Sequence, residues 1–357
     1  MLKQYPTLRY ILQRGVWYFL TFLVAIAINF ILPRLGDRNP VDIMMAKASQ
    51  GLSDEAVKEK RESFEKEFGL IEVTAEGKII HDANGKTVKV SGFNQFLNYL
   101  KMTLSGDLGK SIQKYPKNVS DIIIEAVPWT LALQFPSILL GWIFGNVLGA
   151  LAAYRRGVFD RVIFPMALFM SSVPFFVFGM VLVYWFAVVL GWFPAMEAYS
   201  GALNPSLSLE FIGSMGYHYV LPFFSIFLIL AGGQAIGMRS MGIYELGTDY
   251  IKYAKWLGLK ETKILSYLFR NAMLPQLTGL ALSIGSMVGG ALITEMIFSY
   301  PGLGMAMLTA IGSNDYTVIQ GCTLLVTTSV LVANFSVDIM IGFLDPRVKA
   351  GMQMGGK

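Results

Sequence analysis

Cysteine and histidine are nearly absent from this sequence of 357 residues, which holds one cysteine and two histidines. Because Cys322 lies inside an apolar run, the chain can form neither a disulfide framework nor a thiolate metal cluster. His81 and His218 are far apart in the sequence and have no partners at ligand spacing. We therefore expect no metal site in this chain.

Motifs for nucleotide binding and for catalysis are missing as well. The sequence contains no GxxxxGK[ST] phosphate-binding loop, no nucleophile elbow and no metal-hydrolase pattern. Serine, histidine and acidic residues occur, but no recognised spacing organises them. We expect no catalytic residue and no cofactor here, so any ATP and magnesium that the protein uses must be bound by another chain.

Charge is scarce: charged residues make up 15% of the sequence and hydrophobic residues 54%. This balance suits a chain in lipid better than a soluble core. The net charge of +5 could suggest a nucleic-acid partner. However, the basic residues are dispersed between apolar runs, so we expect membrane lipid and no nucleic acid.

Six apolar runs are each near or above the roughly 20 residues that a helix needs to cross a membrane. They are residues 15–32, 131–153, 165–190, 219–237, 276–297 and 318–344. The first follows a basic start, as in a signal peptide, but it is long enough to span and lacks a small-residue cleavage site. We therefore predict an all-α polytopic membrane protein with six transmembrane helices. Prolines 136, 165 and 174 should kink their helices, and Gly145 and Gly149 should allow close helix packing.

Residues 34–128 hold 28 of the 53 charged residues, which indicates a solvated domain. Ser53 is expected to cap a helix over residues 54–68, and Gly69 to end it. Alternating residues around Asn84-Gly85 predict a β-hairpin, and residues 93–104 a second helix. The sequence thus predicts an α+β insertion domain between the first transmembrane segment (residues 1–33) and a five-helix core (residues 129–357).

The basic residues also predict the orientation. With the N-terminus in the cytosol, the cytosolic segments outside the insertion hold fifteen lysines and arginines, and the short outer loops at 191–218 and 298–317 hold none. This follows the positive-inside rule. Both termini are then cytosolic and the insertion is extracytosolic, because a domain of its length translocates regardless of its charge.

The loop at residues 238–275 is polar and basic, and it lies between two apolar runs. Thr248 and Asp249 can cap a helix, Gly258 can end it with a positive φ, and Pro275 is expected to mark the next boundary. A short helix that ends at a glycine, followed by an amphipathic helix, is suited to contact something in the cytosol. A solvated connector is the simpler interpretation.

The stretch DYIKYAKWLGL resembles the cytosolic coupling loop, or EAA loop, of ATP-binding-cassette importer permeases. Ala254 lies four residues before Gly258, and Pro275 follows, as in that motif. Lys252 stands where the motif has its glutamate, a departure that fits the oligopeptide/dipeptide permease branch. Four further stretches resemble that branch: GDLGKSI (106–112), SSVPFF (171–176), FSYPGLG (298–304) and LDPRVK (344–349).

This resemblance implies a type I importer permease fold in a prokaryotic inner or plasma membrane. The implied partners are a second homologous permease, two ATPases that bind ATP and magnesium, and an extracytosolic substrate-binding protein. The implied coupling residues are Asp249, Tyr250, Tyr253, Ala254, Trp256, Gly258 and Pro275. The three aromatic residues are candidate anchors for an ATPase cleft. Lys252 and Lys255 could instead only face anionic lipid.

Two acidic residues lie in or beside apolar runs. The resemblance places Glu295, Tyr300, Pro301 and Gly302 near a translocation path, and Ser299 and Pro301 can cap and begin a short helix there. The alternative is a re-entrant segment that only seals the helix bundle. Asp338, with Asn334 one turn earlier, can line the path, pair with a basic group of a partner or reach the cytosolic surface.

The sequence therefore predicts a permease subunit of an ATP-driven, binding-protein-dependent importer for oligopeptides or dipeptides. An oligosaccharide importer of the same architecture is an alternative substrate class. A six-span channel would need a selectivity filter or a charged ring, and a membrane-embedded enzyme would need Glu295 or Asp338 as a catalytic group.

Overall fold

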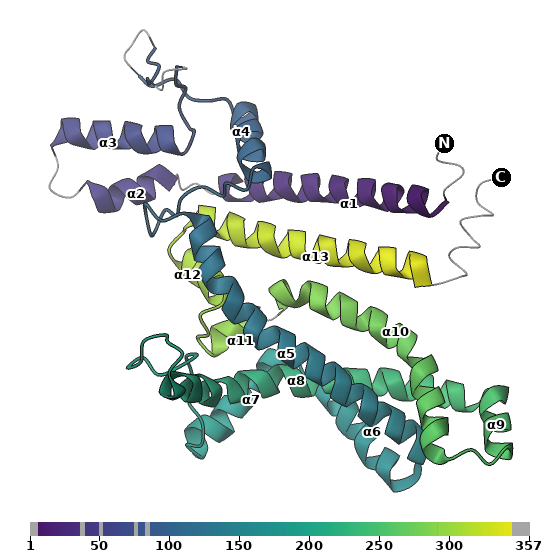
Figure 1. Ribbon diagram of the computed structural model, residues 1–357. Coiled ribbons are helices and arrows are strands. Elements are labelled where there is room, and N and C mark those ends of the chain that lie inside the picture. Colours follow the sequence, from purple (N-terminus) through teal and green to yellow (C-terminus); the bar gives the residue numbers. More distant parts are fainter. Residues whose placement is uncertain are drawn as a thin grey trace. The chain divides into compact units, whose positions relative to one another are not determined.

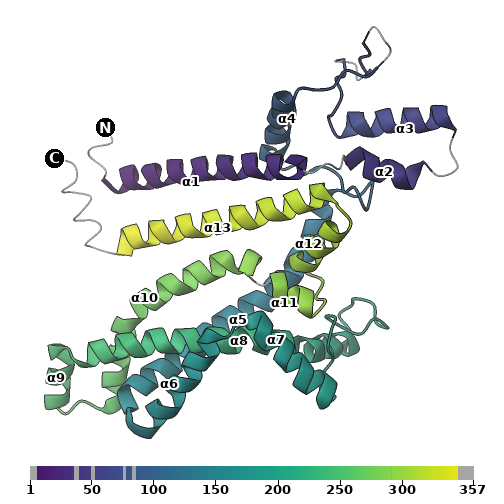
Figure 2. The same ribbon diagram turned by 180° about the vertical axis from the view of Figure 1, so that it is seen from behind.

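A computed structural model describes residues 6–35, 40–49, 53–74, 78–82, 86–290 and 292–344. Within these ranges the regular elements are helices (Figure 1, and from behind in Figure 2). The chain divides into two compact units. The core unit draws on Met1–Val16, Val127–Met305 and Ser329–Lys357, and the insertion unit on Trp17–Ala126 and Ala306–Thr328.

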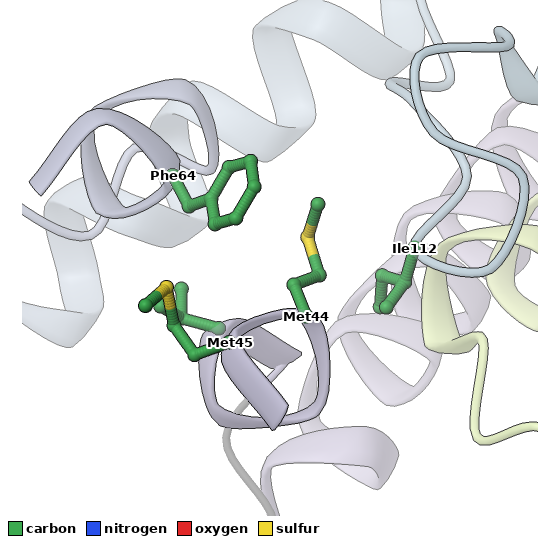
Figure 3. Packing of buried hydrophobic residues seen from close by; sticks show 5 residues of the cluster. Met44, Met45, Phe64 and Ile112 are labelled. Carbon is green, nitrogen blue, oxygen red and sulfur yellow. The ribbon is translucent and has the colours of Figure 1, made fainter. Parts of the chain in front are cut away.

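The insertion unit contains α2 (Pro40–Ala48), α3 (Asp54–Glu67) and α4 (Gly92–Leu104), after the short helix η2 (Leu32–Leu35) that follows α1 (Pro6–Ile31). The hydroxyl of Ser53 accepts the N–H of Ala56 at 3.4 Å, and Gly69 has φ of +64°. The helices predicted at 54–68 and 93–104 are thus confirmed to within a residue or two. α2 and α3 pack together through Met44, Met45 and Phe64, with Ile112 against them (Figure 3).

Isolated antiparallel bridges, and not regular strands, connect α3 to α4. Ile71 pairs with Lys89, Val73 with Ile79, and His81 with Thr87. The predicted turn at Asn84-Gly85 lies outside the described residues. Among the described residues these bridges link three short segments, around 71–73, 79–81 and 87–89, with one bridge between each pair of segments. The described residues therefore do not confirm the strand half of the predicted α+β domain.

Four helical segments are long and apolar enough to cross a membrane: Tyr10–Arg34, Val119–Arg155, Leu209–Leu246 and Tyr316–Ile339. They lie in α1, α5 (Val119–Arg155), α8 (Leu209–Leu246) and α13 (Tyr316–Leu344). α6 (Gly157–Ser172) is followed by α7 (Phe175–Leu182), which continues into the π-helical turn η3 (Val183–Val189). The axis bends by 101° between α6 and this second stretch, at Pro174. Counting this pair as one span gives five in the described chain.

The fifth predicted span, at residues 276–297, does not meet this test within the described residues, which leave out residue 291. α10 (Glu261–Gly290) begins well before it, and the shorter α11 (Leu292–Ile297) follows. Glycines 285, 289 and 290 and the polar residues Gln276 and Ser283 lower the apolar character of this stretch. Six spans are therefore not confirmed within the described residues, whereas a mostly helical, multi-pass membrane protein is.

Glycines bring α5 and α8 of the core unit into close contact, as the sequence predicts. A Cβ added at Gly145 would lie 2.7 Å from Cβ of Gln234, and one added at Gly149 would lie 3.0 Å from Cα of Ala235. Any larger side chain would push the helices apart. Pro136 and Pro165 lie inside α5 and α6, so of the three prolines expected to kink a helix only Pro174 coincides with a break.

Candidate functional site

The predicted coupling loop contains a short helix, α9 (Asp249–Trp256), between the end of α8 and the start of α10 (Figures 1 and 2). Gly258 has φ of +70°, and its N–H donates to the carbonyl of Lys255 at 3.0 Å, which confirms the predicted glycine stop. Thr248 has the extended backbone of an N-cap residue. Its hydroxyl, however, donates back to the carbonyl of Glu245 at 2.6 Å, so the predicted side-chain cap is wrong.

α9 is held on the core unit by one apolar face. Ile251 and Ala254 are buried against Ile264 of α10 and Tyr154 of α5. The hydroxyl of Tyr250 donates to the carboxylate of Glu245 and accepts from Nδ2 of Asn271 at 2.6 Å. These contacts join the ends of α8, α9 and α10, so a push on α9 would reach both longer helices.

The opposite face of α9 is apolar as well, yet exposed. Tyr253, Trp256 and Leu257 are 60%, 77% and 78% exposed, and the two rings meet edge to face with centroids 5.4 Å apart. At its start, a hydrogen bond from Lys252 lowers the pKa of Asp249. Exposed aromatic residues grouped on an anchored helix are typical of an interaction site, because buried aromatics dominate interface energetics.

The loop differs from the prediction in a second respect, because Pro275 does not mark a helix boundary. α10 runs through it from Glu261 to Gly290. A proline inside a helix leaves one carbonyl without its usual donor, but neighbouring helices in a membrane bundle can compensate. The prediction of a helix boundary at Pro275 is therefore wrong, because α10 continues from the loop into the fifth apolar run.

Sequence reasoning also missed an ion pair beside this loop. The guanidinium of Arg239 on α8 donates to both oxygens of Asp160 on α6, at 2.5 and 2.6 Å, and lies 4.1 Å from the ring centroid of Phe164. Both side chains of the pair are about one-fifth exposed. The residues are 79 positions apart, so no local pattern could have revealed the pair.

Glu295 on α11 is fully buried in the core unit. Its Oε2 accepts the N–H of Gly304 at 2.7 Å, and its carboxylate is hydrogen bonded to Thr130, whose hydroxyl also accepts the N–H of Leu303 at 2.9 Å. Glu295 and Thr130 therefore cap α12 (Leu303–Gly312). Within the described part of the chain, Oε1 of Glu295 has no hydrogen-bond partner.

The FSYPGLG turn is built around this carboxylate. A Cβ at Gly302 would lie 2.5 Å from Cδ of Glu295 and 2.6 Å from Oγ1 of Thr130, so only glycine fits. Tyr300 is buried, with its ring edge-on to Trp129 at 5.8 Å between centroids. The predicted cap by Ser299 and Pro301 is wrong, because α12 begins at Leu303. A place of Glu295, Tyr300, Pro301 and Gly302 on a translocation path stays a prediction.

Asp338 on α13 pairs with Arg14 of α1 at 3.5 Å, within the core unit. The basic partner of Asp338 is therefore in the same chain. Asn334, which is half-buried, lies one turn before Asp338 on α13. A role of these two residues in a path also stays a prediction.

A second buried carboxylate, Asp315, was missed. It accepts the N–H groups of Gln113 and Val318 at 2.9 and 3.3 Å and the hydroxyl of Thr317 at 2.8 Å, and it binds the hydroxyl of Ser111. It thereby caps the start of α13 and fixes the GDLGKSI stretch in the insertion unit. An aspartate three residues before the apolar run at 318–344 was the available signal.

Comparison with known proteins assigns the family. Residues 145–350 match the family described as the binding-protein-dependent transport system inner membrane component. The chain is 33% identical to the di/tripeptide transport system permease protein of Pseudomonas aeruginosa, over 72% of this chain and 81% of that protein. It is 30% identical to the oligopeptide transport system permease protein of Bacillus subtilis, over 95% and 99% of the two chains.

A glutathione transport system permease protein of Escherichia coli is 31% identical, over 72% of this chain and 79% of its own length. The family match over residues 145–350 includes four of the five stretches that carry the resemblance, namely the coupling loop, SSVPFF, FSYPGLG and LDPRVK. The chain belongs to the binding-protein-dependent transport system inner membrane components, as an ATP-binding-cassette importer permease of the oligopeptide/dipeptide branch.

Proposed function

We propose that this permease subunit forms one half of the path of an ATP-driven peptide importer, and that α9 docks into a cleft of an ATPase subunit. The exposed cluster of Tyr253, Trp256 and Leu257 on an otherwise anchored helix supports this role most directly. ATP and magnesium belong to the two ATPase subunits. The other partners are a second homologous permease and an external substrate-binding protein.

Coupling follows from the contacts of α9. When ATP draws the two ATPases together, the docked helix moves with them. Ile251 and Ala254 pass that movement to α10, and Tyr250 passes it to the ends of α8 and α10 through Glu245 and Asn271. The two permeases then rock between inward-open and outward-open states. The chain itself performs no chemistry.

The proposed topology has six spans, with α10 and α11 together forming the fifth. Both termini and α9 are cytosolic, and the insertion at residues 34–128 is an extracytosolic α+β domain. The distribution of lysine and arginine among the short loops supports this orientation.

Peptides are the proposed substrates. The similar permeases named above serve di/tripeptides, oligopeptides and glutathione, all of which contain peptide bonds. The aromatic cluster of Trp129, Tyr199, Tyr219 and Tyr300 in the core unit would also suit a sugar face. The names of the relatives therefore support the proposal of peptides over oligosaccharides.

Reconstitution tests the function as a whole. The chain alone in liposomes should give neither substrate flux nor ion current, because the motor and the delivery protein are other chains. With the second permease, two ATPases, the binding protein and Mg-ATP, it should accumulate peptide against a gradient. Flux through the lone chain would indicate a channel, and product formation without transport would indicate an enzyme.

Single cysteines test the orientation. After Cys322 is replaced by serine and activity is checked, Lys86→Cys in the insertion should react with an impermeant thiol reagent in intact spheroplasts. Thr262→Cys, at the start of α10, should react only after permeabilisation. Both positions are exposed, so accessibility of the side chain does not limit either reaction. The reverse labelling pattern would contradict the topology.

Replacing Gly258 with valine tests the turn after α9. A β-branched residue at φ of +70° is strained by roughly 1–3 kcal/mol, and no atom lies within 4 Å of the added Cβ, so steric crowding inside this chain is absent. Peptide-stimulated ATP hydrolysis and uptake should fall together while the chain still inserts. Gly233→Val, inside α8 with equal free space, is the matched control. Wild-type uptake by Gly258→Val would contradict the proposed role.

A further inference from the structure

A groove of about 690 Å³ lies within the insertion unit, and none of its lining residues belongs to α9 or to the cluster around Glu295. Its walls are the end of α3, one face of α4 and the GDLGKSI stretch. The sequence analysis singled out that stretch, and the proposed coupling role does not use it. The groove therefore needs an explanation of its own.

One wall of the groove is a regular helix face. Gln95, Asn98, Lys101, Met102 and Ser105 line it at helical spacing, and all but Gln95 are exposed. Side chains three and four residues apart lie on the same face of a helix. α4 thus presents an amide, an ammonium, a thioether and a hydroxyl to one elongated space, a set suited to an extended peptide segment.

The lining of the groove is predominantly basic. Four basic residues line it, Arg34, Lys66, Lys101 and Lys110, against two acidic ones, Glu67 and Asp107. One residue of each sign is paired within the wall, because Lys110 donates to Glu67 at 2.5 Å. Counted over the whole lining, basic residues outnumber acidic ones by four to two, so the formal charge of the groove favours an anionic ligand.

The two acidic residues of the wall, Glu67 and Asp107, accept hydrogen bonds from other residues of the wall. Partial burial raises the pKa of Glu67, but hydrogen bonds from Lys110 and Tyr115 outweigh it and lower the pKa below its ordinary value. Oδ1 of Asp107 accepts the N–H of Gly109 at 2.9 Å. Both carboxylates therefore already have hydrogen-bond donors from the wall itself.

The wall formed by the GDLGKSI stretch is fixed before any ligand arrives. Asp315 holds Ser111 and Gln113 at one end of it, and Gly106 and Gly109 adopt φ of +81° and +77° within it. A binding surface that is already ordered loses less conformational entropy on binding. The groove is therefore built as a receptor surface.

We propose that this groove receives an acidic segment of the external substrate-binding protein. The inference rests on the proposed function, which places the insertion unit outside the membrane. Carboxylates of that segment would bind Lys101 and Arg34, and its backbone would bind the side-chain amides of α4. The transported peptide is the less suitable occupant, because cargo peptides vary in charge whereas the groove selects one sign.

The test uses the complete transporter in liposomes, with uptake measured as the binding protein is titrated. Lys101→Glu should raise the half-saturating concentration of binding protein roughly tenfold at low salt, and leave uptake at saturation unchanged. High salt should shrink the difference. Lys58→Glu, the same charge change on an exposed residue of α3 outside the groove, is the matched control and should leave the titration unchanged.

A second variant is expected to bind the binding protein more tightly, which a misfolded permease would not do. Asn98→Lys adds a positive charge to the same wall and should lower the half-saturating concentration. Equal titrations for wild type, Lys101→Glu and Asn98→Lys would overturn the proposal, as would an equal effect of Lys58→Glu. Saturable binding of a labelled acidic peptide without binding protein, lost in Lys101→Glu, would make the groove a substrate site instead. Uptake by wild type without binding protein would contradict the proposed function itself.

Discussion

Replacing Trp256 with alanine is expected to weaken the association of the permease with its ATPase subunits by roughly 30-fold or more and to abolish ATP-driven uptake. The side chain is 77% exposed and touches Tyr253, so the chain itself gains little from it. A central aromatic anchor typically contributes about 2 kcal/mol or more to an interface, which corresponds to that factor.

Co-purification of the ATPase subunits with the solubilised permease measures this loss, and uptake in proteoliposomes measures its consequence. Trp17→Ala is the matched control, since Trp17 is 63% exposed on α1, far in sequence from the coupling loop. Normal assembly with lost uptake would assign Trp256 to coupling alone. Normal assembly and normal uptake would remove α9 from the ATPase interface, and leave Trp256 as an anchor at the membrane surface.

The features that the sequence predicted well depend on neighbours in the chain. The start of α3 at Ser53, its end at Gly69 and the positive φ of Gly258 after α9 follow from residues within one or two turns. Hydrophobic length likewise predicted the long helices α5, α8 and α13. Local steric and capping preferences are sufficient for such features.

The features that the sequence did not predict depend on contacts between distant residues. Pro275 continues α10, and the partner of Asp338 is Arg14, at the other end of the chain. Asp160 and Arg239 pair across two helices. Each depends on how helices pack, and a single sequence does not specify packing. Ser299 shows this most clearly. Serine is a common N-cap residue, but the side chains that cap α12 are those of Glu295 and Thr130.

Glu295 has two competing interpretations, a structural cap of α12 and a residue on the substrate path. A carboxylate in the outer part of a membrane protein suggests a group on the substrate path, as the resemblance implies. In the structure it is buried, and its hydrogen bonds to Gly304 and Thr130 join α11, α12 and α5. Structural capping and substrate contact predict different behaviour for the same substitutions, so they can be separated.

Glu295→Ala is expected to destabilise the core unit by roughly 3–5 kcal/mol, because it leaves the N–H of Gly304 and the hydroxyl of Thr130 without an acceptor and opens a cavity. Thermal unfolding of the purified chain in detergent measures this loss. Glu295→Gln keeps an acceptor oxygen and should retain most of the stability. Gly302→Val, which forces a side chain against Glu295 and Thr130, should resemble the alanine variant. If Glu295→Ala instead unfolded at the wild-type temperature and lost uptake, the carboxylate would belong to the path and not to the cap of α12.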